Sequence, residues 1–202
     1  CASTCGQAPG LLGQAVQLGA ASALTVNEPI TVSDFTLALW VKPQTTQSAN
    51  LIARRAGASV QFQLRINAAG AFEAYASDGG PQVISGTTPI VTNTWYHVAA
   101  MATSQGALRL FVNGVEERAG VSMGNLADAG NEYLLGGLTP GAAAPFAGLL
   151  DEVLVYDYAL RHDQIFAIAR STASGAQSVD VGLRHVKDFT DDAAIAWYPA
   201  LM

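Results

Sequence analysis

The stretch FTLALWVKP, residues 35–43, decides the fold class, because its large apolar residues recur at every second position. Successive side chains of a β-strand point to opposite faces, so a spacing of two predicts a strand rather than a helix. The stretch divides into two sets: Phe35, Leu37, Leu39 and Val41 on one face, and Thr36, Ala38, Trp40 and Lys42 on the other. Pro43 ends the predicted strand, since proline has no N–H to donate to a sheet.

The same spacing of two recurs outward from this stretch. Further strands are predicted at residues 60–66, 71–76, 95–103, 107–113, 115–119, 132–135 and 149–157. Asn113-Gly114 is the strongest turn signal, because both residues tolerate the positive φ of a type I′ hairpin. Only residues 161–170 show the spacing of a helix. The pattern predicts an all-β sandwich of two antiparallel sheets with one short helix near 161–170.

Composition excludes several classes of protein. The chain of 202 residues carries ten Lys and Arg against sixteen Asp and Glu, a net charge of −6, and its basic residues are scattered. A nucleic-acid binder needs clustered positive charge, and a membrane-spanning helix needs about 18 consecutive apolar residues; neither is present. We expect a tip at 1–10 that carries both cysteines, one domain at 11–170, and a spacer with an apolar strand at 171–202.

Cys1 and Cys5 are the two cysteines, and their spacing has three interpretations. The first is a local disulfide, which would place the chain in an oxidising compartment. The second is a lipid anchor on Cys1, as in a bacterial lipoprotein. The third is that Cys1 marks only a boundary of the sequence. A zinc site is not expected, because no second pair of ligands follows at a suitable spacing.

Three stretches in order resemble the laminin G-like branch of the concanavalin A-like lectin/glucanase superfamily. They are FTLALWVKP (35–43), WYHVAAMATSQGALRLFVNGVEE (95–117) and FAGLLDEVLVYDYALRHDQI (146–165). The resemblance implies a jelly-roll of two antiparallel sheets. Members of this family include glycan-binding modules, adhesion and receptor ectodomains, and domains with no known ligand, so the fold by itself does not assign a function.

The sequence lacks the paired carboxylates of a glycoside hydrolase. Related glucanases carry Glu-x-Asp-x-x-Glu on one strand, and that motif is absent here. The adjacent acidic pairs Glu116-Glu117 and Asp151-Glu152 are predicted to point to opposite faces of their strands. His97 has two interpretations, a catalytic base or a half-buried histidine that hydrogen-bonds across the sandwich. We expect a protein that is not an enzyme, with a glycoside hydrolase as the minor alternative.

Asp151 is the candidate metal ligand. The resemblance implies a structural Ca²⁺ in relatives. It is held there by an acidic residue near the closing strand and by carbonyls from the first strands. The segment 17–21 would supply those partners, but it lacks the aspartate that relatives carry. Calcium needs several hard oxygen ligands, and Asp151 alone is one. The other interpretation is that Asp151 accepts backbone N–H groups at the start of a strand.

Aromatic and basic side chains on the expected faces suggest a sugar-binding site. The candidate ligand-binding residues are Trp40, Lys42, Tyr75 and Tyr96. Aromatic rings stack on the apolar face of a pyranose, while neighbouring polar groups fix its hydroxyls. The same aromatic residues also suit the packed framework of the family. The loops 44–50, 77–81 and 138–145 are equally suited to contact a sugar.

The C-terminal stretch AIAWYP, residues 194–199, resembles the first strand of the family's sandwich, which is missing near the N-terminus. Its candidate assembly residues are Ile195, Trp197 and Tyr198. The strand has three interpretations: it completes the sheet of its own chain, it adds to the sheet of a neighbouring subunit, or it begins a further domain.

These features together predict a non-catalytic structural or adhesive module, secreted or on the cell surface, that associates with other protein subunits or with itself. The alternative is a carbohydrate-binding module with a glycan as partner. No nucleic acid and no membrane span are expected, and Ca²⁺ is the one cofactor considered.

Overall fold

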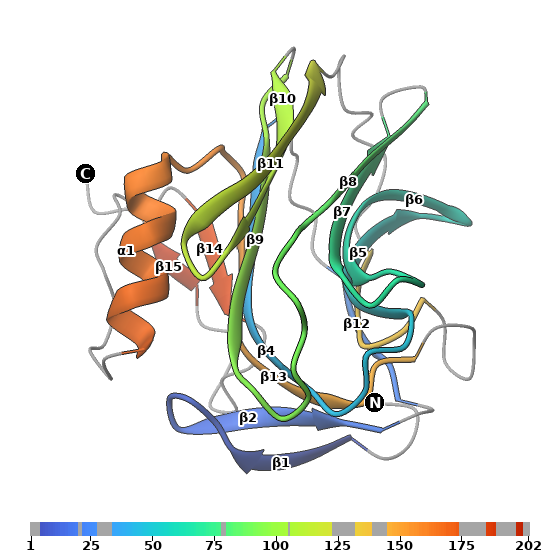
Figure 1. Ribbon diagram of the computed structural model, residues 1–202, viewed down its shortest axis with the longest axis vertical. Helices are drawn as coiled ribbons and strands as arrows, with labels where there is room; N and C mark the ends of the chain where they lie inside the picture. The colour runs from blue at the N-terminus through green and yellow to red at the C-terminus, as the bar shows by residue number, and fades with distance from the viewer. Residues whose placement is uncertain are drawn as a thin grey trace.

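Two antiparallel β-sheets facing each other form the body of the molecule (Figure 1). The computed structural model describes residues 5–19, 22–27, 34–77, 80–104, 106–122, 132–138, 145–173, 185–188 and 197–199. In sheet order, the first sheet contains β1 (Cys5–Pro9), β2 (Gln14–Leu18), β13 (Gly148–Tyr156), β4 (Phe35–Pro43), β9 (Tyr96–Ala102), β10 (Ala107–Val112) and β11 (Val115–Ser122). Two further strands, β14 (His185–Asp188) and β15 (Trp197–Pro199), make it nine-stranded in the described part of the chain.

The second sheet is six-stranded among the described residues. Its order is β3 (Leu24–Asn27), β12 (Glu132–Leu135), β5 (Ala49–Ala56), β6 (Ser59–Ile66), β7 (Phe72–Ser77) and β8 (Pro81–Ser85). One helix, α1 (His162–Ala173), follows β13. The all-β, two-sheet fold with a short helix near 161–170 is thereby confirmed. No helix in the described ranges is long and apolar enough to cross a membrane.

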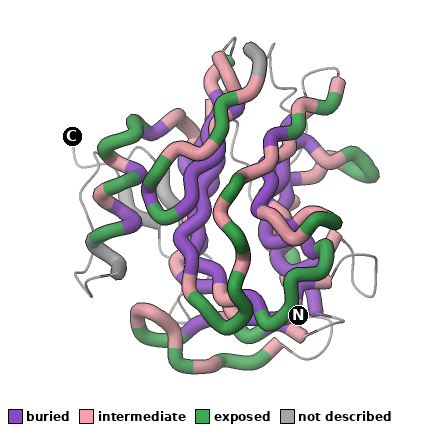
Figure 2. The backbone as a smooth tube through the Cα atoms, viewed as in Figure 1, coloured by how far each residue is buried: buried purple, intermediate pink, exposed green. Residues whose placement is uncertain are grey.

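The main core lies between the sheets, and the alternation in the sequence builds it. The apolar set of β4 that begins at Phe35 and ends at Val41 points into this core, opposite Phe62, Leu64 and Ile66 of β6. The rings of Phe35 and Phe62 stack across the sandwich with their centroids 4.3 Å apart. Figure 2 shows the buried stretches of the two sheets facing each other. Burial of these apolar surfaces is the main stabilising contribution to the fold.

A second, smaller core lies under α1, on the outer face of the nine-stranded sheet. Ile165 and Ile168 of the helix pack there against Ala38 and Ala99 of the sheet, together with Phe111. The small alanine side chains let the helix approach closely, and Figure 1 shows α1 on the side away from the six-stranded sheet. As a result β4 is buried on both faces, and the face of Trp40 is not an open surface.

Strand β13 has three partners. It pairs with β4 over Gly148–Tyr156, while its other edge pairs first with β2 and then, from Leu154 onward, with β14. A bulge between Asp151 and Leu154 interrupts the pairing with β4, and Glu152 there has a φ of +47°. Strand β15 pairs with β14, so the described part of the C-terminal segment lies on the sheet of its own chain.

The sequence pattern did not predict every strand. Strand β5 lies partly in the segment 44–50, which was expected to be a loop. The sequence pattern did not predict this strand, because two register shifts disrupt its alternation. Strand β8 begins at Pro81, the last residue of the expected loop 77–81. Strand β1 extends the sheet from within the predicted tip at 1–10, because its backbone pairs with β2 over Cys5–Pro9.

Candidate ligand-binding face

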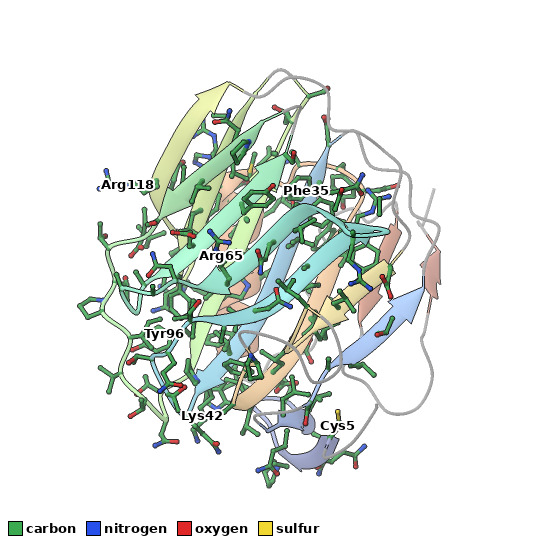
Figure 3. The ribbon with its side chains drawn as sticks, turned by 90° about the vertical axis from the view of Figure 1, so that its right-hand side faces the viewer. Cys5, Phe35, Lys42, Arg65, Tyr96 and Arg118 are labelled. Atoms are coloured by element: carbon green, nitrogen blue, oxygen red, sulfur yellow. The ribbon has the colours of Figure 1, made fainter. Side chains whose placement is uncertain are left out.

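Three neighbouring strands of the six-stranded sheet present polar and aromatic side chains on the face turned away from the core. Their cross-strand register forms two rows of three residues: Gln63–Tyr75–Val83 and Arg65–Glu73–Ser85. The intervening residues, such as Leu64, Ala74 and Ile84, belong to the main core. We call these six residues the β6–β8 face. Figure 3 looks onto this side of the molecule and shows Arg65 near its middle.

Glu73 organises the polar row of the β6–β8 face. Its Oε1 accepts a hydrogen bond of 2.6 Å from Arg65 Nε and forms an ion pair with Arg65 Nη2. Its Oε2 accepts hydrogen bonds from Ser85 Oγ at 2.6 Å and from Asn67 Nδ2 at 3.0 Å. Two guanidinium nitrogens thus meet one carboxylate oxygen, and such charge-assisted contacts hold the guanidinium in a fixed orientation.

The charge state of Glu73 follows from these contacts. Burial raises the pKa of this carboxyl, but hydrogen bonds from Ser85, Asn67 and Arg65, with the charge of Arg65, outweigh burial and lower its pKa below the ordinary value. Glu73 is therefore ionised at neutral pH, and the polar row carries one negative and one positive charge in contact.

The second row supplies an aromatic surface. Arg65 lies over the ring of Tyr75 with its central carbon 5.8 Å from the ring centroid. Val83, directly opposite Tyr75 on β8, is 47% exposed. Gln63 donates to Asn50 Oδ1 at 2.9 Å and accepts from Arg65 Nη1 at 3.4 Å. An aromatic ring and an apolar neighbour beside fixed hydrogen-bonding groups suit a ligand with both an apolar face and hydroxyls.

The predicted ligand-binding residues do not converge on one surface. Tyr75 lies on the β6–β8 face, whereas Trp40 and Lys42 lie on the outer face of the nine-stranded sheet, beside His97 and Trp95 respectively. Tyr96 is in the main core, where its hydroxyl accepts the N–H of Val91 at 2.8 Å.

Sequence reasoning missed Gln63, Arg65, Glu73 and Ser85 as a group. The alternation of VQFQLRI already placed Gln63 and Arg65 together on an outward face. The same spacing of two in FEAYAS (72–77) puts Glu73 and Tyr75 on one face. These two alternating stretches were the signal in the sequence that could have identified the group. The pairing of these strands in register joins the two faces.

His97 departs from its expected environment. It is 1% exposed, its ring lies 5.5 Å from that of Trp40, and both ring nitrogens lack a hydrogen-bond partner among the described residues. The expectation of a half-buried histidine bonded across the sandwich is therefore wrong. His97 points instead to the outer face of its sheet, where burial lowers its pKa from 6.5 to about 4.

Asp151 fixes the turn between β1 and β2. Its Oδ2 accepts the N–H groups of Leu11 at 2.6 Å and Leu12 at 3.1 Å, and its Oδ1 accepts the N–H of Glu152 at 3.0 Å. This matches the interpretation of Asp151 as an acceptor of backbone N–H groups. Within the described ranges no group of three His, Cys, Asp or Glu side chains could hold a metal ion. A calcium site at Asp151 stays a prediction, since its other ligands would be carbonyls.

The remaining predicted sites lie at the two ends of the chain. Cys5 begins β1 and is disulfide-bonded, while Cys1 lies outside the described residues, so their pairing stays a prediction. Ile195 also lies outside the described residues. Trp197 and Tyr198 belong to β15, with backbone partners Lys187 and Val186.

The adjacent acidic pair at Glu116-Glu117 is split between two surroundings. Glu116 Oε1 accepts from Arg109 at 2.7 Å, and its Oε2 lies 3.0 Å from His162 Nε2. Glu117 instead accepts the N–H groups of Thr87 and Thr88 in the loop after β8. These two carboxylates do not face each other across a common site. Their adjacent positions on one strand predicted this separation.

Comparison with known proteins bears on the family and the fold of the chain. The family model described as the concanavalin A-like lectin/glucanases superfamily matches residues 15–166. No curated protein sequence matches the chain.

Solved structures resemble the chain at low sequence identity. Domain 4 of AbnA, a GH43 extracellular arabinanase from Geobacillus stearothermophilus solved in complex with arabinotriose, is 24% identical with a TM-score of 0.63; the match covers 83% of this chain and 82% of that domain. The SAP-like pentraxin from Limulus polyphemus is 16% identical with a TM-score of 0.66, over 88% of this chain and 91% of that one. A putative carbohydrate binding protein from Bacteroides ovatus is 22% identical with a TM-score of 0.59, over 75% of this chain and 45% of that one. These likenesses show the fold.

Proposed function

The chain belongs to the concanavalin A-like lectin/glucanase superfamily, and from this premise we propose that it is a non-catalytic module that binds carbohydrate on the β6–β8 face. The observation that carries the proposal is the Tyr75–Val83 surface beside the fixed Arg65–Glu73 pair. Sugar rings offer apolar C–H faces for such a surface and hydroxyls for the polar row. Support comes from two structural neighbours, one solved with arabinotriose and one described as a putative carbohydrate binding protein.

The proposal places the module outside the cell. The arabinanase neighbour is extracellular, and Cys5 is disulfide-bonded, which is common in oxidising compartments. A catalytic role is not part of the proposal, because the carboxylates Glu116 and Glu117 are directed into separate hydrogen-bond networks.

The test is binding of glycans to the chain and to two matched variants. Tyr75→Ala removes the aromatic ring of the β6–β8 face. Phe166→Ala removes a ring from α1, on the other side of the molecule (Figure 1), at a residue that is 44% exposed. We expect a glycan array and calorimetry with arabinotriose to give binding that Tyr75→Ala weakens about tenfold or more and Phe166→Ala leaves unchanged. Circular dichroism checks that both variants fold. No binding to any glycan, or equal binding by Tyr75→Ala, would overturn the proposal.

Assembly with other protein subunits by strand addition is the second candidate function. Its observation is β15, a three-residue strand that pairs only with β14 in the described part of the chain and so leaves one edge open. A neighbouring chain could pair with that edge through main-chain hydrogen bonds. Light scattering on the intact and truncated chain separates the two functions.

A further inference from the structure

The charges on the β6–β8 face cancel. Arg65 is its one cation and Glu73 its one anion, and the two are in contact. The other arginines on the nearby strand β5 are engaged elsewhere. Arg55 pairs with Glu132 at 2.6 Å, and Arg54 is buried over the rings of Phe62 and Tyr133. The face therefore offers no uncompensated positive charge to a ligand.

The guanidinium of Arg65 also has one of its two carboxylate-binding edges occupied. A guanidinium binds a carboxylate best through two parallel N–H groups, and Arg65 directs its Nε and Nη2 groups to Glu73. A third N–H, on Nη1, points to Gln63. Of the five N–H groups of an arginine, two remain for a ligand, which suits single hydrogen bonds to hydroxyl oxygens.

The whole chain adds to this preference. Its net charge is −6, so a polyanionic ligand is repelled at long range, increasingly so at low ionic strength. The side chain of Arg65 is 33% exposed and that of Glu73 only 8% exposed, so an incoming anion cannot simply take the place of the Glu73 carboxylate.

We propose that the β6–β8 face selects uncharged sugars over sugars that carry a carboxylate, and that Glu73 is the residue that sets this specificity. The inference rests on the proposed function and adds to it a class of ligand. Neutral glycans present hydroxyls to the free N–H groups of Arg65 and an apolar ring face to Tyr75. Uronate and sialate groups would meet a guanidinium whose charge is neutralised and whose Nε–Nη2 edge is held by Glu73.

The experiment compares neutral ligands with related ligands that carry a carboxylate. The pairs are polygalacturonate against its carboxyl-reduced, neutral form, and sialyllactose against lactose. Wild-type protein is expected to bind a neutral member of a pair at least about tenfold more tightly than the acidic member. Its affinity for the neutral ligand is expected not to change between about 20 and about 500 mM salt, because no net charge is neutralised on binding.

Glu73→Gln tests the assigned residue. It keeps the side-chain shape but removes the charge that neutralises Arg65, so binding of the acidic ligand should rise about tenfold or more and become weaker with added salt. Glu132→Gln is the matched control, because it releases Arg55 from a similar ion pair outside the β6–β8 face. It should leave the preference for neutral sugars unchanged.

The outcomes separate the two proposals. Equal or tighter binding of the acidic ligand by wild type would overturn the specificity while leaving carbohydrate binding intact. An unchanged preference in Glu73→Gln would show that Glu73 does not set it. Absence of binding to every neutral and acidic glycan would overturn the proposed function itself. If Glu73→Gln does not fold, the paired ligands and the salt titration on wild type still decide whether neutral sugars are selected.

Discussion

His97 shows how one buried residue makes stability depend on pH. Its pKa is lowered from 6.5 to about 4 because burial disfavours the charged imidazolium. The unfolded chain therefore binds a proton as the pH falls below 6.5, whereas the folded chain stays unprotonated there down to about pH 4. The stabilising contribution of His97 is complete above pH 6.5 and is lost as the pH falls through this window.

We expect the free energy of unfolding to drop by about 2 kcal/mol between pH 7 and pH 5 on account of His97. His97→Phe keeps an aromatic ring but cannot titrate, so it should remove most of this drop, as followed by urea denaturation at each pH. His162→Gln is the control, because that histidine is exposed, with 55% of its side chain accessible. The measurement stays above pH 5, where Glu73 with its lowered pKa remains ionised. A slope that persists in His97→Phe would contradict the prediction.

Asp151 is the second residue with a sharp consequence. Asp151→Asn puts an NH₂ group where N–H donors of the β1–β2 turn or of Glu152 now bind, so we expect a loss of about 2 kcal/mol or more in urea denaturation. Asp163→Asn is the control, since that carboxylate is exposed at the start of α1. Because hydrogen bonds already reach both Asp151 oxygens, a wild-type midpoint that is the same in calcium and in EDTA would favour this structural role over the calcium site predicted there. A lower midpoint in EDTA would establish a calcium site instead.

At the scale of elements, the β10–β11 hairpin and α1 stabilise each other through Gly114. The turn residues Asn113 and Gly114 have φ values of +52° and +79°, as a type I′ turn requires. A Cβ at position 114 would lie 3.0 Å from the Cα of Phe166 and 3.2 Å from the Cβ of Ala169. The turn thus uses glycine both for its backbone conformation and for the close approach of the helix.

Two glycine substitutions separate these effects. Gly57 has a φ of +57°, and a Cβ added there would meet nothing within 4 Å, so Gly57→Ala should cost only the backbone strain, about 1 kcal/mol. Gly114→Ala should cost about 1–2 kcal/mol more, because α1 must also move. Thermal unfolding of both variants measures the difference. Equal losses would show that the helix does not depend on the turn.

At the scale of the whole molecule, the pairing of the C-terminal segment leads us to predict a monomer. Strand β15 pairs with β14, and β14 with β13, all within one chain. A truncation after residue 189 removes β15 and frees one edge of β14. We expect it to remain monomeric and to lose about 1–2 kcal/mol of stability, a few degrees in Tm.

Size-exclusion chromatography with light scattering on the intact and truncated chain measures this. If both chains are monomers and only the truncated chain is less stable, the result would support a strand that completes its own sheet. It would also support a module that acts by binding. Larger assemblies that disappear on truncation would support strand addition to a neighbour, and the second candidate function would take first place.

The sequence by itself determined the features that depend on neighbours a few residues apart. The alternation of residues 35–43 and 60–66, the Asn113-Gly114 turn and the short helix after β13 all appear in the structure, because side-chain period and turn propensity are local properties. Strand β5 was missed for the same reason, since its two register shifts break the local period.

Only the tertiary structure decided which surfaces are open and which residues meet. Alternation assigned Trp40 to a face but did not show that this face is covered: α1 packs on the same sheet face against Ala38 and Ala99, and Trp40 is buried. Gln63 and Arg65 meet Tyr75 and Glu73 because hydrogen-bonded register aligns two strands. That register and the packing of layers are set by the core as a whole, which joins residues far apart in the chain, and no single stretch of sequence encodes them.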